Sequence, residues 1–354
     1  MSNDQRHYGS RSEQTKTTDY HSKMSQTLLT LEDVEVHFNQ STDILASLRN
    51  AFGDGPDVIR AVDGVDIELR ENEVQGIIGE SGCGKTTLLK TMVNLQEPTG
   101  GEVYFKGDPL SVFDDKWMRR FRRNVQIIFQ DPFDSLDPKF TVEDTLEEQL
   151  DIHGLDNRDE RKREILRQVH LEPAERYLDK YPRELSGGEK QRVSIARALI
   201  VDPDVILADE PVSMLDVSTQ ASILNLLSNI VESYDLSIAY ISHDLSTVSY
   251  ICDTINVMYL GRIVESAPTM QILEEPKHPY TQALIQSIPL PDPYANRQRV
   301  NLDGEIPDPK DIPSGCRFKD RCPERMEACD RMPPVESVDA NHHVACHLHT
   351  ESDE

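Results

Sequence analysis

Residues 79–86 read GESGCGKT, which places glycine, lysine and hydroxyl side chains at the spacing of a phosphate-binding loop. Glycines let the backbone wrap a phosphate group so that successive N–H groups point at the anion. Lys85 is suited to reach the β- and γ-phosphates of a nucleotide, and the Thr86 hydroxyl to ligate Mg²⁺. The residues expected to contact the nucleotide are Gly79, Glu80, Ser81, Gly82, Cys83, Gly84, Lys85, Thr86 and Thr87.

Two adjacent carboxylates form a second candidate group. Asp209 and Glu210 follow the apolar run 205–208, which has the composition of a buried strand. At the tip of such a strand Asp209 is placed to hold Mg²⁺, directly or through water. Glu210 is one residue further and can polarise a water for in-line attack on the γ-phosphate. Together with the phosphate loop, the pair predicts hydrolysis of a nucleoside triphosphate.

A third motif, LSGGEKQR at residues 185–192, precedes an expected helix. Ser186 can cap that helix, and Gly187 and Gly188 leave its first N–H groups accessible. This is a second anion-binding helix start in a chain with one phosphate loop. A symmetric pair of chains would resolve the mismatch, because each helix start could then face the partner's γ-phosphate.

GESGCGKT, ILADE and LSGGEKQR together resemble the nucleotide-binding subunit of ATP-binding-cassette (ABC) transporters. The resemblance implies ATP and Mg²⁺ as ligands and ATP hydrolysis as the activity. It also implies that Gln130 contacts Mg²⁺ and the attacking water and links to a membrane subunit, and that His243 contacts the γ-phosphate. Asp216 would lie in the loop that crosses to the partner chain, and Phe38 would stack on adenine.

A narrower resemblance, to dipeptide and oligopeptide importer ATPases, rests on three further segments. They are EPVSMLDVS at 210–218, YLGRIVE at 259–265 and HPYT at 278–281, the last followed by IPLPDP at 288–293. This resemblance implies two transmembrane permease subunits, a second ABC ATPase subunit in a heterodimer, and indirectly an extracellular substrate-binding protein. It leaves the cargo open, since close relatives handle nickel complexes, glutathione or sugars. The implied location is the cytoplasm, peripheral on the inner face of the cell membrane.

Near the C-terminus a module carries Cys316, Cys322, Cys329 and Cys346 in the pattern C-x5-C-x6-C-x16-C. A reducing cytosol disfavours disulfides. Four thiolates on a loop-rich scaffold suit a [4Fe–4S] cluster, and some peptide-importer ATPases resemble this stretch and bind one. Zinc sites usually contain a closer cysteine pair, and unliganded thiols also remain an alternative. Nearby histidines leave a mixed ligand set open: His342, His343, His347 and His349.

The net charge of the chain argues against a nucleic-acid-binding protein. The formal net charge of −26 over 354 residues repels nucleic-acid phosphates. It suits a high-salt cytoplasm, although an ordinary acidic cytosolic protein has a similar balance. The sequence shows no signal peptide and no apolar run of about 20 residues, so we expect a soluble protein that reaches a membrane through a partner. A soluble ABC ATPase acting on DNA or ribosomes is disfavoured, because the chain has one cassette and no sustained heptads between its motifs.

Strands alternating with helices predict an α/β protein with a mainly parallel sheet covered on both faces. We expect a P-loop NTPase of the ABC cassette type, with an antiparallel β subdomain, a helical subdomain and the small C-terminal cysteine module. The expected boundaries are a disordered tail at 1–26, the cassette at 27–288 with its helical subdomain at about 131–185, and the module at 289–354. Strands are expected at 29–38 (an edge strand), 61–79 (two strands), 102–105, 125–129, 204–208, 237–241 and 254–258. Helices are expected after residue 85, within 141–180, and at about 187–201 and 218–233.

Overall fold

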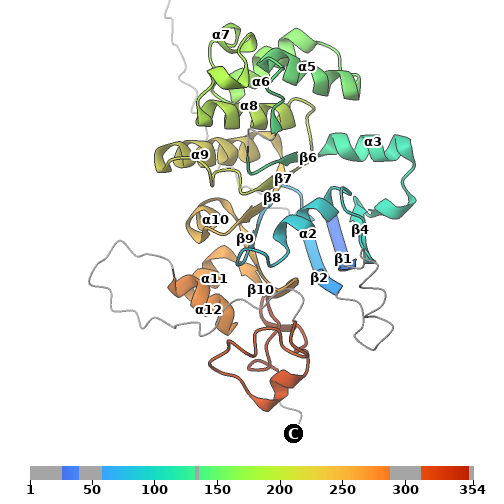
Figure 1. Cartoon of the computed structure of the whole chain (residues 1–354), viewed down its shortest axis with the longest axis vertical. Coiled ribbons are helices and arrows are strands. Elements are labelled where there is room, and N and C mark those ends of the chain that lie inside the picture. The colour runs from blue at the N-terminus through green and yellow to red at the C-terminus, as the bar shows by residue number, and fades with distance from the viewer. Residues whose placement is uncertain (1–25, 40–57, 132–134, 288–311, 351–354) are drawn as a thin grey trace, which may run out of the picture.

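The structure is a computed structural model that describes residues 26–39, 58–131, 135–287 and 312–350. A large sheet lies in the middle of the molecule, a group of helices at one end and the C-terminal segment at the other (Figure 1). The expected tail, apart from Gln26, and the segment 288–293 lie outside the described residues.

The large sheet has eight strands. Five adjacent strands of this sheet run parallel to one another, as the sequence predicts. Its central strands β3, β7 and β8 are buried along their whole length, because helices cover both faces of a parallel sheet. In spatial order the strands are β11 (Glu336–Asp339), β12 (His342–Val344), β10 (Arg262–Pro268), β9 (Thr254–Tyr259), β3 (Val74–Ile78), β8 (Ser237–Ser242), β7 (Val205–Asp209) and β6 (Val125–Ile128).

A second, four-stranded sheet is antiparallel and matches the expected β subdomain. The segment expected as an edge strand, β1, in fact lies between two partners, so the edge prediction is wrong. Its alternating apolar residues bury one face, while backbone groups on both sides are paired. The strands in order are β2 (Val58–Arg70), β1 (Thr27–Asn39), β4 (Gly100–Phe105) and β5 (Asp108–Pro109).

The helices fall into three groups (Figure 1). Three helices and a 3-10 turn occupy the region expected as the helical subdomain, and the sequence did not separate them: α5 (Val142–His153), α6 (Arg158–Gln168), α7 (Glu175–Leu178) and η2 (Pro182–Glu184). Helices that pack against the sheets are α2 (Lys85–Met92), α8 (Gly187–Leu199), α9 (Val217–Tyr234), α10 (Leu245–Ile251), α11 (Thr269–Glu274) and α12 (Pro279–Gln286). Helix α3 (Asp115–Asn124) contacts β6, and two further 3-10 turns of the described residues are η1 (Leu110–Val112) and η3 (Glu327–Asp330).

Helix α3 was missed by the sequence analysis, although Asp114 caps it and accepts a hydrogen bond from the Trp117 amide at 2.8 Å. Most of its residues are charged, chiefly arginine, so the sequence shows little of the apolar periodicity that indicates a helix. Phe121 is its buried residue. No helix among the described residues is both long enough and apolar enough to cross a membrane.

The C-terminal segment is part of the cassette's packing. Its strands β12 and β11 extend the large sheet beyond β10 through antiparallel pairing. Phe318 is buried against Tyr259 and Tyr280, with ring centroids 5.3 and 5.5 Å away. Aromatic contacts of this kind stabilise a core beyond the area they bury. The described part of the module therefore shares a hydrophobic core with the main sheet.

Candidate nucleotide-binding site

The phosphate loop connects β3 to α2, as its sequence predicts. Gly84 has φ +108°, and a Cβ there would lie 2.0 Å from the Ala61 carbonyl oxygen, so the position requires glycine. The Lys85 ammonium is turned into the loop and donates to the carbonyls of Gly79 and Glu80 at 2.7 and 3.0 Å. The loop thus holds its cation over the concave side where a phosphate chain would lie.

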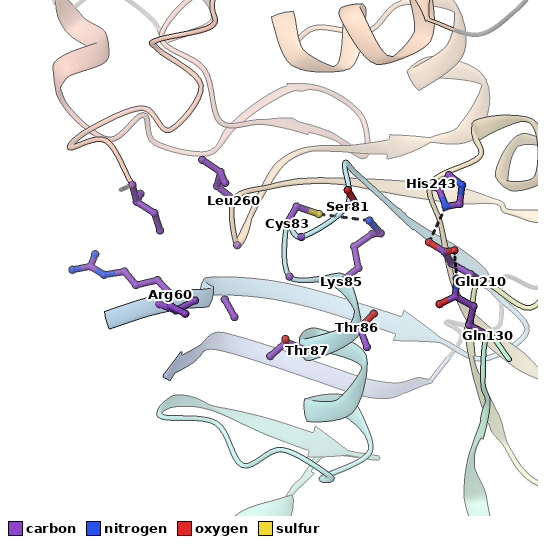
Figure 2. A pocket seen from close by; sticks show the side chains of 16 residues that line it. Arg60, Ser81, Cys83, Lys85, Thr86, Thr87, Gln130, Glu210, His243 and Leu260 are labelled. Carbon is purple, nitrogen blue, oxygen red and sulfur yellow. Dashed lines mark hydrogen bonds and ion pairs between the residues drawn. The ribbon is translucent and has the colours of Figure 1, made fainter. Parts of the chain in front are cut away.

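A cavity of about 670 Å³ opens over this loop (Figure 2). At one side of the cavity lie Gln130, Glu210 and His243, and at the other Arg60 and Leu260, with Lys85 between them. The full set of lining residues is Ile59, Arg60, Ala61, Ser81, Gly82, Cys83, Gly84, Lys85, Thr86, Thr87, Gln130, Glu210, His243, Leu260, Gly261 and Ile312.

Two of the three predicted Mg²⁺ ligands, Asp209 and Thr86, meet beside the cavity, and the third, Gln130, lines it. Asp209, at the end of β7, is hydrogen-bonded to Thr86, the second residue of α2. Burial raises the pKa of Asp209, and the neighbouring Glu210 adds to this, while Thr86 and Lys85 oppose it. A divalent cation would favour the charged carboxylate, and oxygen ligands of this kind are those that Mg²⁺ prefers. The described residues therefore fit the ion that the sequence predicts.

Glu210 is the centre of a three-residue network. One carboxylate oxygen accepts from the Gln130 amide at 2.9 Å, and the other lies 2.8 Å from His243 Nδ1 (Figure 2). The backbone of Glu210 has φ +44°, an uncommon conformation for a non-glycine residue and one that occurs at functional sites. Three residues predicted to act together, from three separate segments, are thereby held at one edge of the cavity.

The LSGGEKQR motif forms the N-terminus of α8. Ser186 and Glu189 make a reciprocal capping box, and Ser186 and Gly187 are exposed. The helix start packs closely on that of α9, since a Cβ on Gly188 would lie 2.7 Å from the Thr219 side chain. Asp216 caps α9, and hydrogen bonds from Ser218 and Thr219 lower its pKa. None of Ser186, Gly187, Gly188 and Asp216 is among the described residues lining the cavity.

Phe38, predicted to stack on adenine, lies near the end of β1 and is 39% exposed. It is not among the described residues lining the cavity, whereas Ile59 and Arg60 of the paired strand β2 are. Its stacking role stays a prediction.

Two functional candidates that the sequence analysis did not identify as site residues hold the phosphate loop from outside. Tyr280, in the HPYT segment, accepts a hydrogen bond from the Glu80 amide at 3.0 Å. Arg321, between the first two cysteines of the module, donates to both Glu80 carboxylate oxygens at 2.8 and 3.0 Å. No local sequence signal pairs Arg321 with Glu80, because 241 residues separate them.

The four module cysteines are free thiols close enough to influence one another. Burial raises the pKa of Cys346 to about 11, and the charges of the other three thiols add to this. Among the described residues, only Glu35, His37 and Asp63 bring three potential ligand atoms within 4.8 Å of one another. The sulfur atoms of the module cysteines are therefore farther apart than a tetrahedral zinc site requires.

The mixed ligand set that the sequence left open stays a prediction. His342 Nε2 lies 2.7 Å from the Glu265 carboxylate, and His349 Nε2 lies 3.2 Å from the Lys277 carbonyl. His347 Nε2 lies 3.0 Å from the Arg331 carbonyl. Each of these three rings uses Nε2 in the contact described, and Nδ1 is the ring atom through which it could join the thiols as a ligand.

Comparison with known proteins agrees with this geometry. Residues 62–213 match the ABC transporter family, and residues 264–329 match the C-terminal region of oligopeptide/dipeptide transporters. The oligopeptide transport ATP-binding protein AppF of Bacillus subtilis is 41% identical over 92% of this chain and 98% of its own length. The dipeptide transport ATP-binding protein DppF of Escherichia coli is 39% identical over 91% of this chain and 95% of its own length.

Among solved structures, a dimeric ATP-binding cassette in a post-hydrolysis state with ADP and Pi has a TM-score of 0.58 and 28% identity. The alignment covers 68% of this chain and 99% of that one. The chain belongs to the ABC transporter ATPases, in the family of oligopeptide and dipeptide transport ATP-binding proteins.

Proposed function

We propose that this chain is the ATP-hydrolysing subunit of an importer of dipeptides and oligopeptides. The observation that carries the catalytic part is the network of Gln130, Glu210 and His243 beside the phosphate loop. Phosphate oxygens would take the place of the loop carbonyls as partners of Lys85, and Thr86 and Asp209 would hold Mg²⁺. Glu210 would then polarise the attacking water, with Gln130 and His243 fixing the direction of its carboxylate.

We also propose that each complete site is shared between two chains. The signature helix start is exposed at Ser186 and Gly187, yet neither residue is among the described residues that line this chain's own cavity. A helix N-terminus attracts phosphate, and a facing arrangement would bring it to the partner's γ-phosphate. Asp216, capping the neighbouring helix, would cross the same interface. A second, similar ABC ATPase is the partner that the family resemblance favours, although the motif set also permits pairing with itself.

The proposed transport role is supported by the relatives and by the family match of the C-terminal region. Relatives named as oligopeptide and dipeptide transport ATP-binding proteins span more than nine-tenths of the chain. We propose two transmembrane permeases as partners, contacted through the helical group and the Gln130 segment, and a location on the inner face of the membrane. An extracellular binding protein would deliver the cargo, and we propose no nucleic-acid partner.

Uptake by the assembled transporter in vesicles tests this proposal. Labelled di- and oligopeptides should enter when ATP is supplied on the side of this chain, and Glu210→Gln should abolish the uptake. A nickel complex, glutathione and a sugar serve as competing cargo. Uptake of one of these in place of peptides would overturn the peptide assignment while leaving the ATPase assignment intact.

We further propose that the four module cysteines hold a metal–sulfur group, for which a [4Fe–4S] cluster is the candidate. Support comes from four buried or half-buried thiols that act on one another and are too widely spaced for one tetrahedral zinc ion. Such a group would cross-link the loops of the module. Iron and sulfide content after anaerobic purification tests the proposal, and protein that retains neither would refute it.

A further inference from the structure

Glu80, the second residue of the phosphate loop, is held at two points by groups outside the loop and at a third by the loop's own lysine. Its carboxylate accepts two hydrogen bonds from Arg321, its amide donates to the Tyr280 hydroxyl, and its carbonyl accepts from Lys85. A bidentate arginine–carboxylate pair fixes orientation as well as position. Glu80 therefore ties the loop to the C-terminal part of the chain.

The anchor is rigid because its own surroundings are packed. The Arg321 side chain is 7% exposed, and it lies 3.3 Å from the Tyr259 hydroxyl and over the rings of Tyr259 and Phe318. Tyr280 is fully buried against Phe318. Burial strengthens an ion pair relative to one in water, provided both partners are hydrogen-bonded. Arg321 is thus a fixed support and not a mobile surface side chain.

A second arginine of the same segment supports the neighbouring turn. Arg317 donates to the Leu260 carbonyl and to the Asp63 carboxylate. The amide of Gly261, the residue after Leu260, donates to the Cys83 carbonyl of the phosphate loop at 2.8 Å. The cysteine segment therefore reaches the phosphate loop directly through Arg321, and indirectly from Arg317 through the turn at Leu260 and Gly261.

We propose that Arg321 is a positioning residue of the ATP site, which acts through Glu80 to hold the phosphate loop in its binding conformation. The proposal rests on the phosphate-loop assignment above. If the loop is in its binding conformation only part of the time, the apparent Kd equals the intrinsic Kd divided by the fraction of molecules in that conformation. Losing the anchor should therefore weaken nucleotide binding, while saturating ATP should restore the order and with it the rate of hydrolysis.

The test uses the full chain with Arg321→Gln, Arg321→Lys, Glu80→Gln and the double variant Arg321→Gln/Glu80→Gln. The matched control is Arg325→Gln, since Arg325 lies in the same segment and pairs with Asp320 and Asp330 on the surface. Thermal unfolding is recorded for each variant, and the affinity for Mg–ATP is measured below the unfolding transition. Steady-state hydrolysis then gives KM and kcat separately.

We expect Arg321→Gln and Glu80→Gln each to weaken ATP binding by about 10- to 100-fold, the range for hydrogen bonds to a charged group. For Arg321→Gln, KM should rise by a similar factor with kcat within about threefold of the wild type. Because the two residues act as one unit, the double variant should be no worse than either single one. Arg321→Lys should be intermediate, since lysine keeps the charge without the two-pronged geometry.

Three results would overturn the proposal: an affinity equal to that of Arg325→Gln, losses that multiply in the double variant, or a lower kcat with unchanged KM. If Arg321→Gln does not fold, Glu80→Gln and Arg321→Lys carry the same comparison. Lys85→Ala separates this proposal from the site assignment. Weak binding in Lys85→Ala with normal binding in Arg321→Gln removes the positioning role alone, whereas normal binding in Lys85→Ala removes the site.

Discussion

Replacement of Glu210 by glutamine separates catalysis from binding, because the substitution changes charge and basicity with almost no change in shape. The carboxylate is bound by Gln130 at 2.9 Å and by His243 at 2.8 Å. A glutamine carbonyl can keep the contact with Gln130, and its amide can donate to His243 if the ring presents Nδ1 as an acceptor. The network should therefore persist, while the group that polarises water is lost.

A positioned general base contributes about 10²- to 10⁴-fold to a rate, which corresponds to roughly 3 to 5 kcal/mol of transition-state stabilisation. We expect kcat of Glu210→Gln to fall by this factor, with ATP affinity unchanged or tighter because a negative charge near the phosphates is removed. Phosphate release under saturating Mg–ATP measures the rate, and equilibrium titration measures the affinity. Hydrolysis within about threefold of the wild type would refute the role assigned to Glu210.

Three further predictions concern binding, pH and salt. Lys85→Ala should weaken Mg–ATP binding by about 10- to 100-fold, as judged by titration, because the ammonium supplies charge-assisted hydrogen bonds to the phosphates; unchanged affinity would contradict the loop assignment. Burial lowers the pKa of His278 to about 3 from its ordinary value of 6.5, so its contribution to stability is complete above pH 6.5 and is lost as the pH falls toward 3. Denaturation by urea across this range should be less pH-dependent in His278→Asn, and an equal pH dependence would rule out this histidine as a source. The net charge of −26 should make the melting temperature rise between about 0.1 and 1 M KCl as the Debye length shortens, and a fall would argue against charge repulsion as a limit on stability.

Much of the nucleotide site could be predicted from the sequence because its parts are local. The phosphate loop, the Asp209–Glu210 pair and the Ser186 helix cap are each short patterns whose function follows from one strand–loop or loop–helix junction. Parallel strands then bring their ends to the same edge of the sheet, which places Glu210 near Gln130 and His243. The structure adds the distances that turn these separate patterns into one network.

What the sequence did not reveal depends on contacts between distant segments. Strand β1 has the alternating pattern of an edge strand, yet β4 pairs with its open side. The Arg321–Glu80 pair joins positions 241 residues apart, and nothing in either neighbourhood indicates the other. The module's two strands are short and polar in part, so the pairing of β12 with β10, and of β11 with β12, is decided by the sheet edge they meet and not by their own periodicity.

The central claim is that this chain's phosphate loop is half of a site that another chain's signature helix completes. The most direct test is the solution mass of Glu210→Gln, measured by light scattering with Mg–ATP or Mg–ADP, for the chain alone and mixed with the second ATPase subunit. We predict that Mg–ATP doubles the 40.2 kDa mass of one chain or produces a one-to-one complex with the second subunit. Adding Ser186→Arg, an exposed substitution at the helix start, should weaken that association. A mass that does not change with ATP in either sample would contradict the shared site.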